Sequence, residues 1–228
     1  MDDAPVTVAR WSGPLGEVVL RRRGVGQESV EELIVNGTFA MDSAETHSEQ
    51  ALAALAWPGA RVLVGGLGLG FTTTALLDAG VGAVDVVEIE EGLVAWAYEG
   101  VTARLGRVAR DPRARLWVAD VRAVLTGVEV EPQGPWDAIL LDVDNGPDFL
   151  IHSENAALYR EPVLEAAYAQ LAPGGVLAIW CQGADAGLWS RMQALTPTAR
   201  EEPHEVQRGR HVIRYVIYTA HAPGSVSC

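Results

Sequence analysis

The chain has 228 residues, of which 49% are hydrophobic, and its formal net charge at pH 7 is −13. That many apolar side chains can bury a sizeable core, which excludes wholesale disorder and favours one large α/β domain with a small appendage. The negative charge argues against nucleic acid as the main partner, because phosphate binding needs a basic surface. An acidic protein instead attracts cationic small molecules such as amines.

The sequence carries no signal for a membrane, a metal or a disulfide framework. Its two cysteines, Cys181 and Cys228, lack the spacing of a metal site or a disulfide scaffold, and we expect Cys181 to be a buried thiol. The first residues lack the basic and apolar regions of a secretory signal, and no apolar run approaches the roughly 18 residues of a membrane span. We therefore expect a cytoplasmic protein without a membrane partner.

Residues 1–45 are predicted to form a small β segment, followed by a catalytic domain over residues 46–228. Glu17–Arg22 and Glu32–Val35 are strand-like, and Asn36-Gly37 after them is a tight-turn signal. The segment is therefore expected to be an antiparallel appendage.

Residues 46–228 alternate between helical and strand-like patterns. The predicted strands are Arg61–Val64, Ala83–Ile89, Ala114–Trp117, Trp136–Asp142, Val176–Trp180 and, last, Val212–Tyr218. The predicted helices are Ser48–Leu55, Thr72–Ala79, Glu91–Leu105, Val121–Thr126 and Glu161–Leu171. This alternation predicts a doubly wound, mostly parallel Rossmann-like sheet covered on both faces, with the last strand antiparallel at or near its edge.

A glycine-rich turn follows the first of these strands. Residues 61–70 read Arg-Val-Leu-Val-Gly-Gly-Leu-Gly-Leu-Gly, so Gly66, Gly68 and Gly70 form a Gly-x-Gly-x-Gly turn. Glycine suits a place where a strand bends sharply into a helix while its backbone approaches a ligand. Glu88 ends the next strand, where a carboxylate can accept hydrogen bonds from both hydroxyls of a ribose. These features predict a site for a nucleoside-bearing cofactor.

Acids also follow the third and fourth strands. Asp120 comes after the third strand, and Asp142 and Asp144 come after the fourth. Ligands of doubly wound sheets lie beyond the carboxyl ends of the strands, so this series predicts one ligand lying across neighbouring strand ends. Each acid taken alone is also compatible with a helix cap.

These motifs resemble the class I S-adenosylmethionine-dependent transferases. The resemblance rests on the glycine turn, on Asp120 and on Pro173-Gly174-Gly175 before the fifth strand. Residues 61–70, 87–90, 119–120 and 137–142 look like the spermidine synthase (aminopropyltransferase) family, and residues 142–148 with 155–159 resemble its bacterial spermidine-synthase-like branch. The resemblance covers most of residues 30–182.

The resemblance implies roles for the strand-end acids. Glu88 would hold the ribose hydroxyls, and Asp120 would bind the adenine amino group. Asp142 would take a proton from an amine nucleophile, because a protonated amine cannot attack a sulfonium. Asp144 or Asp148 would replace the second acceptor acid of the family.

Several further residues are candidates with an alternative structural role. His47 and Glu49 precede the domain like the family's Tyr-His-Glu helix start, and they either line the cofactor cleft or cap the helix. His152 would lie over the acceptor or be solvated, and Tyr159 would line the acceptor pocket or anchor the loop in the core. We expect Trp96, Trp136 and Trp180 in the core.

Two departures from the family pattern guide the choice of reaction. Leu69 stands where polyamine-forming members have an acid that neutralises the amine of decarboxylated S-adenosylmethionine, and an apolar residue cannot pair with an ammonium. Asn145 stands where the family has its second acceptor acid, so it is a candidate substrate-binding residue with an altered role. We therefore expect methyl transfer from S-adenosylmethionine to a small molecule such as an amine.

Two alternatives stay open. The first is aminopropyl transfer from decarboxylated S-adenosylmethionine to a diamine, and the second is a protein that binds the nucleoside without turnover. The family resemblance also makes a homodimer an expectation.

Overall fold

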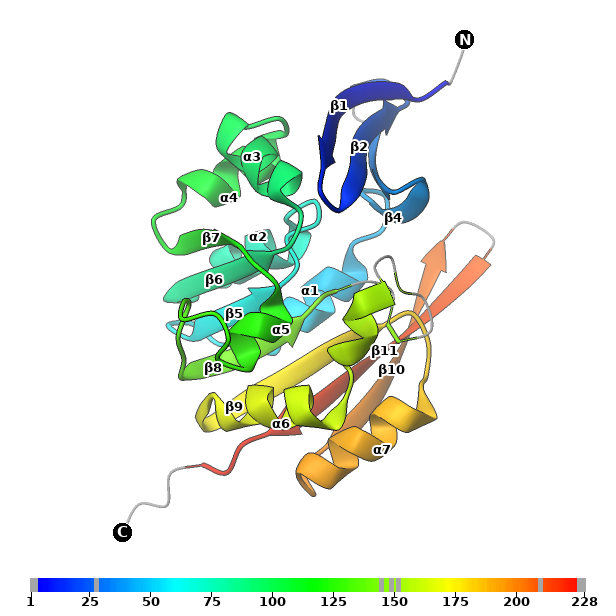
Figure 1. Cartoon of the computed structure of the whole chain (residues 1–228). Coiled ribbons are helices and arrows are strands. Elements are labelled where there is room, and N and C mark those ends of the chain that lie inside the picture. Colours follow the sequence, from blue (N-terminus) through cyan, green and yellow to red (C-terminus); the bar gives the residue numbers. More distant parts are fainter. Residues whose placement is uncertain are drawn as a thin grey trace.

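The computed structural model of the chain describes residues 4–26, 29–143, 146–147, 150, 153–208 and 211–224. These residues form an α/β fold with a seven-stranded sheet and a four-stranded antiparallel sheet near the N-terminus (Figure 1). The strand order of the large sheet is β10-β11-β9-β8-β5-β6-β7. The strands β9, β8, β5, β6 and β7 are parallel to one another. Strand β11 is antiparallel to β9, and β10 is antiparallel to β11. The predicted mostly parallel Rossmann-like sheet is therefore confirmed.

The boundaries of the elements are as follows. The parallel strands are β5 (Arg61–Gly65), β6 (Ala83–Glu88), β7 (Ala114–Val118), β8 (Trp136–Leu141) and β9 (Leu171–Cys181). They are followed by the hairpin of β10 (Arg200–Arg208) and β11 (His211–His221). The helices are α1 (His47–Ala53), α2 (Phe71–Asp78), α3 (Glu91–Glu99), α4 (Ala103–Arg110), α5 (Val121–Leu125), α6 (Glu161–Ala169), α7 (Ala186–Leu195) and the 3-10 helix η2 (Ser153–Ala157). None of the described helices combines the length and apolar character that a membrane-spanning segment needs.

Both faces of the large sheet are buried. Successive residues of a strand point to opposite faces, so Val62 and Val64 join the core beneath α1 to α4, whereas Leu63 joins the core beneath α5 to α7. Burial on both sides explains why these strands read as continuous apolar runs. The strand ends are therefore the places where polar side chains gather.

The small sheet consists of β1 (Val6–Gly13), β2 (Gly16–Arg23), β3 (Val30–Val35) and β4 (Thr38–Asp42). The predicted strands became β2 and β3, and the predicted tight turn at Asn36-Gly37 joins β3 to β4 with positive φ at both residues. Leu20 and Leu33 of this sheet belong to the same core cluster as the helices α1 to α4. The small sheet is therefore packed directly against the large one, close to the glycine turn.

The helix predicted over Glu91–Leu105 is two helices. Gly100 ends α3 in the left-handed conformation at φ 71°, which breaks the helical hydrogen-bond pattern. Thr102 then starts α4, with its hydroxyl oxygen accepting a hydrogen bond from the Leu105 amide at 3.1 Å. In the Gly-x-Thr sequence, the glycine ends the first helix and the threonine caps the start of the second.

The C-terminal part also differs from the expectation. A hairpin of two antiparallel strands, not one strand, completes the sheet, and α7 before it was not predicted. β9 begins at Leu171, so Pro173-Gly174-Gly175 lie inside the strand and not before it. The edge strand β10 carries charged residues and Pro203, a composition that protects sheet edges and hides the strand pattern.

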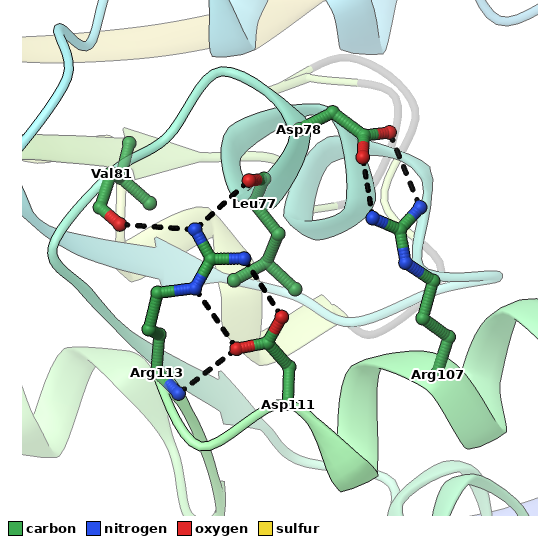
Figure 2. Close-up of polar contacts among 6 residues, drawn as sticks. All are labelled: Leu77, Asp78, Val81, Arg107, Asp111 and Arg113. Atoms are coloured by element: carbon green, nitrogen blue, oxygen red, sulfur yellow. Dashed lines mark hydrogen bonds and ion pairs between the residues drawn. The ribbon is translucent and has the colours of Figure 1, made fainter.

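An ion-paired cluster lies where α2 and α4 end and β7 begins, at the amino ends of the strands. Figure 2 shows Arg113 joined to Asp111, with Arg113 Nη1 also donating to the Leu77 carbonyl oxygen at 3.0 Å. Arg107 pairs with Asp78 beside it. These arginines lower the pKa of Asp78 and Asp111, chiefly through the side-chain hydrogen bonds. The cluster ties the two helices to the start of β7.

Candidate cofactor and acceptor site

A cavity of about 160 Å³ opens at the carboxyl ends of the parallel strands, the edge of the sheet that lies opposite the ion-paired cluster. Its wall combines residues from the small sheet, from the start of α1, from the glycine turn and from the ends of β6, β7, β8 and β9. Its polar and aromatic lining residues are Ser48, Glu49, Phe71, Thr72, Glu88, Glu90, Asp120, Asp142, Asn155 and Trp180. The position agrees with the predicted place for a ligand across the strand ends.

The three glycines of the turn all have positive φ, at 97° for Gly66, 50° for Gly68 and 81° for Gly70. A β-carbon on Gly66 would lie 2.3 Å from the backbone oxygen of Asp142, and one on Gly68 would lie 2.7 Å from the sulfur of Met41. The contact with the Asp142 backbone leaves no room for a side chain at Gly66, whereas the Met41 side chain would have to move to admit one at Gly68. The glycines are thus required by close approaches within the protein as well as by the backbone conformation.

The backbone N–H groups of this turn are used inside the protein. Gly66 donates to the Val87 carbonyl oxygen at 2.8 Å, and Gly70 donates to the Leu67 carbonyl oxygen at 2.8 Å. The Leu67 amide donates to Glu88 Oε2 at 2.7 Å, and the Leu69 amide donates to the Met41 sulfur at 3.3 Å. These hydrogen bonds fix the conformation of the turn and tie it to β6 and β4.

Glu88 is buried at the end of β6 and lines the cavity. Its Oε2 accepts from the Leu67 amide and its Oε1 accepts from the Glu90 amide at 2.8 Å, which fixes the carboxylate in place. Burial raises the pKa of Glu88, while these two amides act to lower it. The Gly68 amide also bonds to this carboxylate, and since a carboxylate has about four lone-pair sites, capacity remains to accept from a ligand hydroxyl.

Asp120 caps a helix and lines the cavity. Its Oδ1 accepts from the Arg122 amide at 2.8 Å and thereby caps α5, and its Oδ2 pairs with the Arg122 guanidinium at 2.8 Å. The same residue lines the cavity. Asp120 is therefore a cap at the cavity wall, with its charge balanced by Arg122.

Asp142 and Glu49 come from distant parts of the chain and face the same cavity. Asp142 follows β8, and its Oδ2 accepts from the Thr72 hydroxyl at 2.7 Å. Glu49 lies in the first turn of α1, is only 8% exposed, and accepts from the Ser48 hydroxyl. Burial and the nearby charge of Asp142 raise the pKa of Glu49 to about 7, and burial raises the pKa of Asp142 as well. Two carboxylates therefore lie close together without a balancing charge.

The cavity is acidic. Five carboxylate side chains contribute to its lining, and no arginine or histidine is among the described residues that line it. No ion pair joins Glu49, Glu88 or Asp142 to a cationic side chain in the described part of the chain. Such a site attracts a cationic ligand and repels an anionic one. No group of three or more potential metal ligands occurs among the described residues.

Two predicted site residues, His47 and Tyr159, are not among the residues that line the cavity. His47 is 72% exposed in its side chain and is hydrogen-bonded to Glu45, so it lies at the surface near the start of α1. Tyr159 is buried, and its hydroxyl donates to the Val143 carbonyl oxygen at 2.7 Å, which anchors the segment after β8 in the core. Asp144, Asn145 and His152 lie outside the described residues.

Sequence reasoning missed four contributors to the site. Met41 of β4 lines the cavity and contacts the glycine turn, and Ser48 and Thr72 each donate to one of the paired carboxylates. Trp180, which we expected in the core with Trp96 and Trp136, lines the cavity. Thr72 directly follows the turn in the first residues of α2, which is the only local signal among these.

The side chain of Leu69 does not face the cavity, although we expected it beside the amine of the donor. Its side chain is fully buried in the core beneath the helices, and it is not among the residues that line the cavity. The charge of the cavity is therefore set by Glu49, Asp142 and Glu88, and the side chain at position 69 does not contribute to its wall.

Comparisons with known proteins agree with this geometry. A spermidine synthase in complex with the transition state analogue AdoDATO superposes with a TM-score of 0.74, at 16% identity over 95% of this chain and 73% of that chain. The chain has the spermidine synthase fold. The spermidine synthase from Thermotoga maritima gives a TM-score of 0.71 at 16% identity, covering 95% of this chain and 72% of that one.

A second group of neighbours has a related fold with lower similarity. TrmN from Thermus thermophilus matches with a TM-score of 0.52 at 24% identity, over 75% of this chain and 47% of that chain. No protein-family model matches the sequence, and no curated protein matches it. The resemblance stated from the motifs is thus confirmed for the spermidine synthase fold.

Proposed function

We propose that this chain transfers a carbon group from an S-adenosyl sulfonium donor to a small amine. The observation that carries the proposal is the acidic cavity at the strand ends, where Glu49, Asp142 and Glu88 have no cationic partner in the described protein. A sulfonium donor and an ammonium acceptor supply the missing positive charges. Burying the carboxylates next to such ligands offsets the cost of keeping them desolvated.

The donor would bind through the residues of the strand ends. Glu88, held by two amides, has the lone pairs to accept from the ribose hydroxyls, and Asp120 faces the place for the adenine amino group. The Gly-x-Gly-x-Gly spacing of the turn differs from the Gly-x-Gly-x-x-Gly spacing of dinucleotide-binding turns. A nicotinamide-dependent dehydrogenase is therefore disfavoured.

Asp142 would serve the acceptor. Its carboxylate is oriented by the Thr72 hydroxyl and lies beside Glu49, so the pair can hold an ammonium group close to the sulfonium. An ammonium must lose a proton before its nitrogen can attack, and a carboxylate beside it is suited to that role. Holding the two reactants side by side contributes the rest of the acceleration.

Methyl transfer from intact S-adenosylmethionine is the first candidate reaction. The second acceptor acid of the polyamine-forming family is missing from this chain, because Asn145 stands in its place. One observation favours aminopropyl transfer as the second candidate. The described lining holds no cation for the carboxylate of the intact donor, and decarboxylated S-adenosylmethionine has no such carboxylate.

Calorimetry and a product assay test the proposal. We expect S-adenosylmethionine or its decarboxylated form to bind, and we expect mass spectrometry to detect S-adenosylhomocysteine with the first donor or methylthioadenosine with the second. The acceptors to use are 2-aminoethanol, 1,3-diaminopropane and 1,4-diaminobutane. If neither donor binds at millimolar concentration, the proposal is refuted. Binding without product from any acceptor would favour a nucleoside-binding protein without turnover.

A further inference from the structure

We infer that Glu49 is the proton acceptor of the transfer reaction and that Asp142 holds the ammonium group of the acceptor. This assignment rests on the proposed function and divides the roles within its carboxylate pair. It differs from the assignment by resemblance, in which Asp142 takes the proton. The argument depends on how each carboxylate is held.

Asp142 is the more constrained of the two. Its backbone N–H donates to the Gly65 carbonyl oxygen at 2.9 Å, and its Oδ2 accepts from Thr72 at 2.7 Å. Its backbone oxygen also lies against Gly66, so the residue is locked to the glycine turn. Burial raises the pKa of Asp142 and the hydrogen bond from Thr72 opposes that rise, so a carboxylate fixed in this way is suited to pair with an ammonium that favours its charged form.

Glu49 is placed to change its protonation state. It is buried, it lines the same cavity, and its side-chain partner is the hydroxyl of the neighbouring Ser48, which can rotate to donate or accept. The titratable groups that face it are Asp142, Glu45 and Tyr215, and none of them is a cation. Burial and the negative charges of Asp142 and Glu45 bring the pKa of Glu49 to about 7, near the optimum for a general base at neutral pH.

The proposed step is balanced. The ammonium group of the acceptor, held at Asp142, gives one proton to the ionised Glu49 carboxylate, which becomes a carboxylic acid. The nitrogen lone pair that this frees forms the new N–C bond as the C–S bond of the donor breaks, and the sulfur keeps that electron pair as a neutral thioether. The proton on Glu49 then returns to solvent before the next turnover.

The pH dependence of kcat/KM in single variants tests this assignment. We expect the wild type to lose activity below about pH 7, with an acidic limb that reports the ionisation of Glu49. Glu49→Gln is expected to remove this limb and to lower kcat about 100-fold or more. Asp142→Asn is expected to raise KM for the acceptor more than it lowers kcat, and to move the limb to lower pH, because the charge that raises the pKa of Glu49 is gone.

Ser48→Ala is the matched variant if Glu49→Gln does not fold. The Ser48 hydroxyl favours the charged form of Glu49, so its removal is expected to move the acidic limb to higher pH while the carboxylate itself is retained. A carboxyl ¹³C NMR titration of the protein without ligands gives a readout independent of turnover. We expect one carboxyl signal that titrates near pH 7, is absent in Glu49→Gln and moves to higher pH in Ser48→Ala.

The outcomes separate this inference from the proposed function. An acidic limb that Glu49→Gln retains, with kcat within about threefold of the wild type, would overturn the assignment and leave the transferase proposal standing. A limb that Ser48→Ala leaves unmoved would do the same. A wild type that yields no product with either donor would overturn the transferase proposal and, with it, the role of Glu49.

Discussion

The carboxylates at the two ends of the large sheet differ in their charge partners and in the direction of their pKa shifts. At the amino ends of the strands, Asp78 and Asp111 are paired with Arg107 and Arg113, and the pKa of each acid is lowered (Figure 2). At the carboxyl ends, burial without a cation raises the pKa of Glu49, Asp142 and Glu88. Asp78 and Asp111 therefore have a structural role, and under the proposed function the unbalanced carboxylates mark the place of a cationic ligand.

The largest expected contrast between the two ends is in catalysis. Asp142→Asn is expected to lower kcat/KM for the acceptor by about 10² to 10⁴, because the carboxylate that holds the ammonium is lost. Asp111→Asn, the control at the amino ends, is expected to leave kcat/KM within twofold of the wild type, since its partner Arg113 lies far from the cavity wall. Product formation followed by mass spectrometry measures both. Equal losses in the two variants would contradict the division into structural and functional acids.

The second contrast is the sign of the pH dependence of stability. The pKa of Glu49 is about 7 in the folded protein against an ordinary value of 4.5, so the folded state binds its proton more tightly. The wild type therefore loses about 3 kcal/mol of unfolding free energy from this group as the pH rises from 4.5 through 7. The Glu49→Gln variant has no such group. In urea titrations its free energy of unfolding is therefore expected to rise relative to that of the wild type, by about that amount, between pH 5 and pH 8.

The control for this measurement has the opposite sign. The pKa of Asp111 is lowered by Arg113, so its contribution is present at neutral pH and is lost as the pH falls through its folded value. Asp111→Asn is therefore expected to be less stable than the wild type at pH 8. The difference in unfolding free energy between Glu49→Gln and the wild type should therefore grow from pH 5 to pH 8. An equal difference at both pH values would show that the pKa of Glu49 is not raised in the folded protein.

A third contrast concerns the donor. Glu88→Gln is expected to weaken donor binding about 10- to 100-fold, because a neutral amide replaces a charged acceptor of the ribose hydroxyls. Glu91→Gln, on the exposed side of α3 only three residues further along, is the matched control and is expected to bind as the wild type does. Calorimetric titration with S-adenosylhomocysteine measures both. An unchanged affinity of Glu88→Gln would remove Glu88 from the donor site.

The smallest expected effect belongs to the exposed ion pair of Asp78 and Arg107, whose side chains are 58% and 48% exposed. Solvent and salt screen such a pair strongly. Asp78→Asn is expected to change Tm less than Glu49→Gln does at pH 8, and the change is expected to vanish in 1 M NaCl. A large Tm change that persists in high salt would show that the pair is needed to hold α2 against α4.

The sequence predicted the parts of this molecule that depend on local patterns. Apolar runs at Arg61–Gly65 and Trp136–Leu141, with glycines and acids directly after them, identified strands buried on both faces and the edge at which a ligand would lie. The break at Gly100 was not predicted, since one helix was expected over Glu91–Leu105, although Gly100 and Thr102 are residue types that end and start helices. The edge strand β10 escaped prediction because its charged, proline-containing sequence lacks strand periodicity.

Only the tertiary structure decided which of these residues act together. Glu49 and Asp142 are far apart in the chain, and no spacing rule indicates that α1 and the end of β8 would bring two carboxylates into one cavity. The same holds for Met41, which reaches the glycine turn from the small sheet. Local sequence fixes backbone conformation and which side chains are buried, but the pKa of a carboxylate depends on charges and on solvent exclusion by residues from elsewhere in the chain. For that reason, the acids could be found from the sequence, whereas the lack of a balancing charge beside them was visible only in the folded protein.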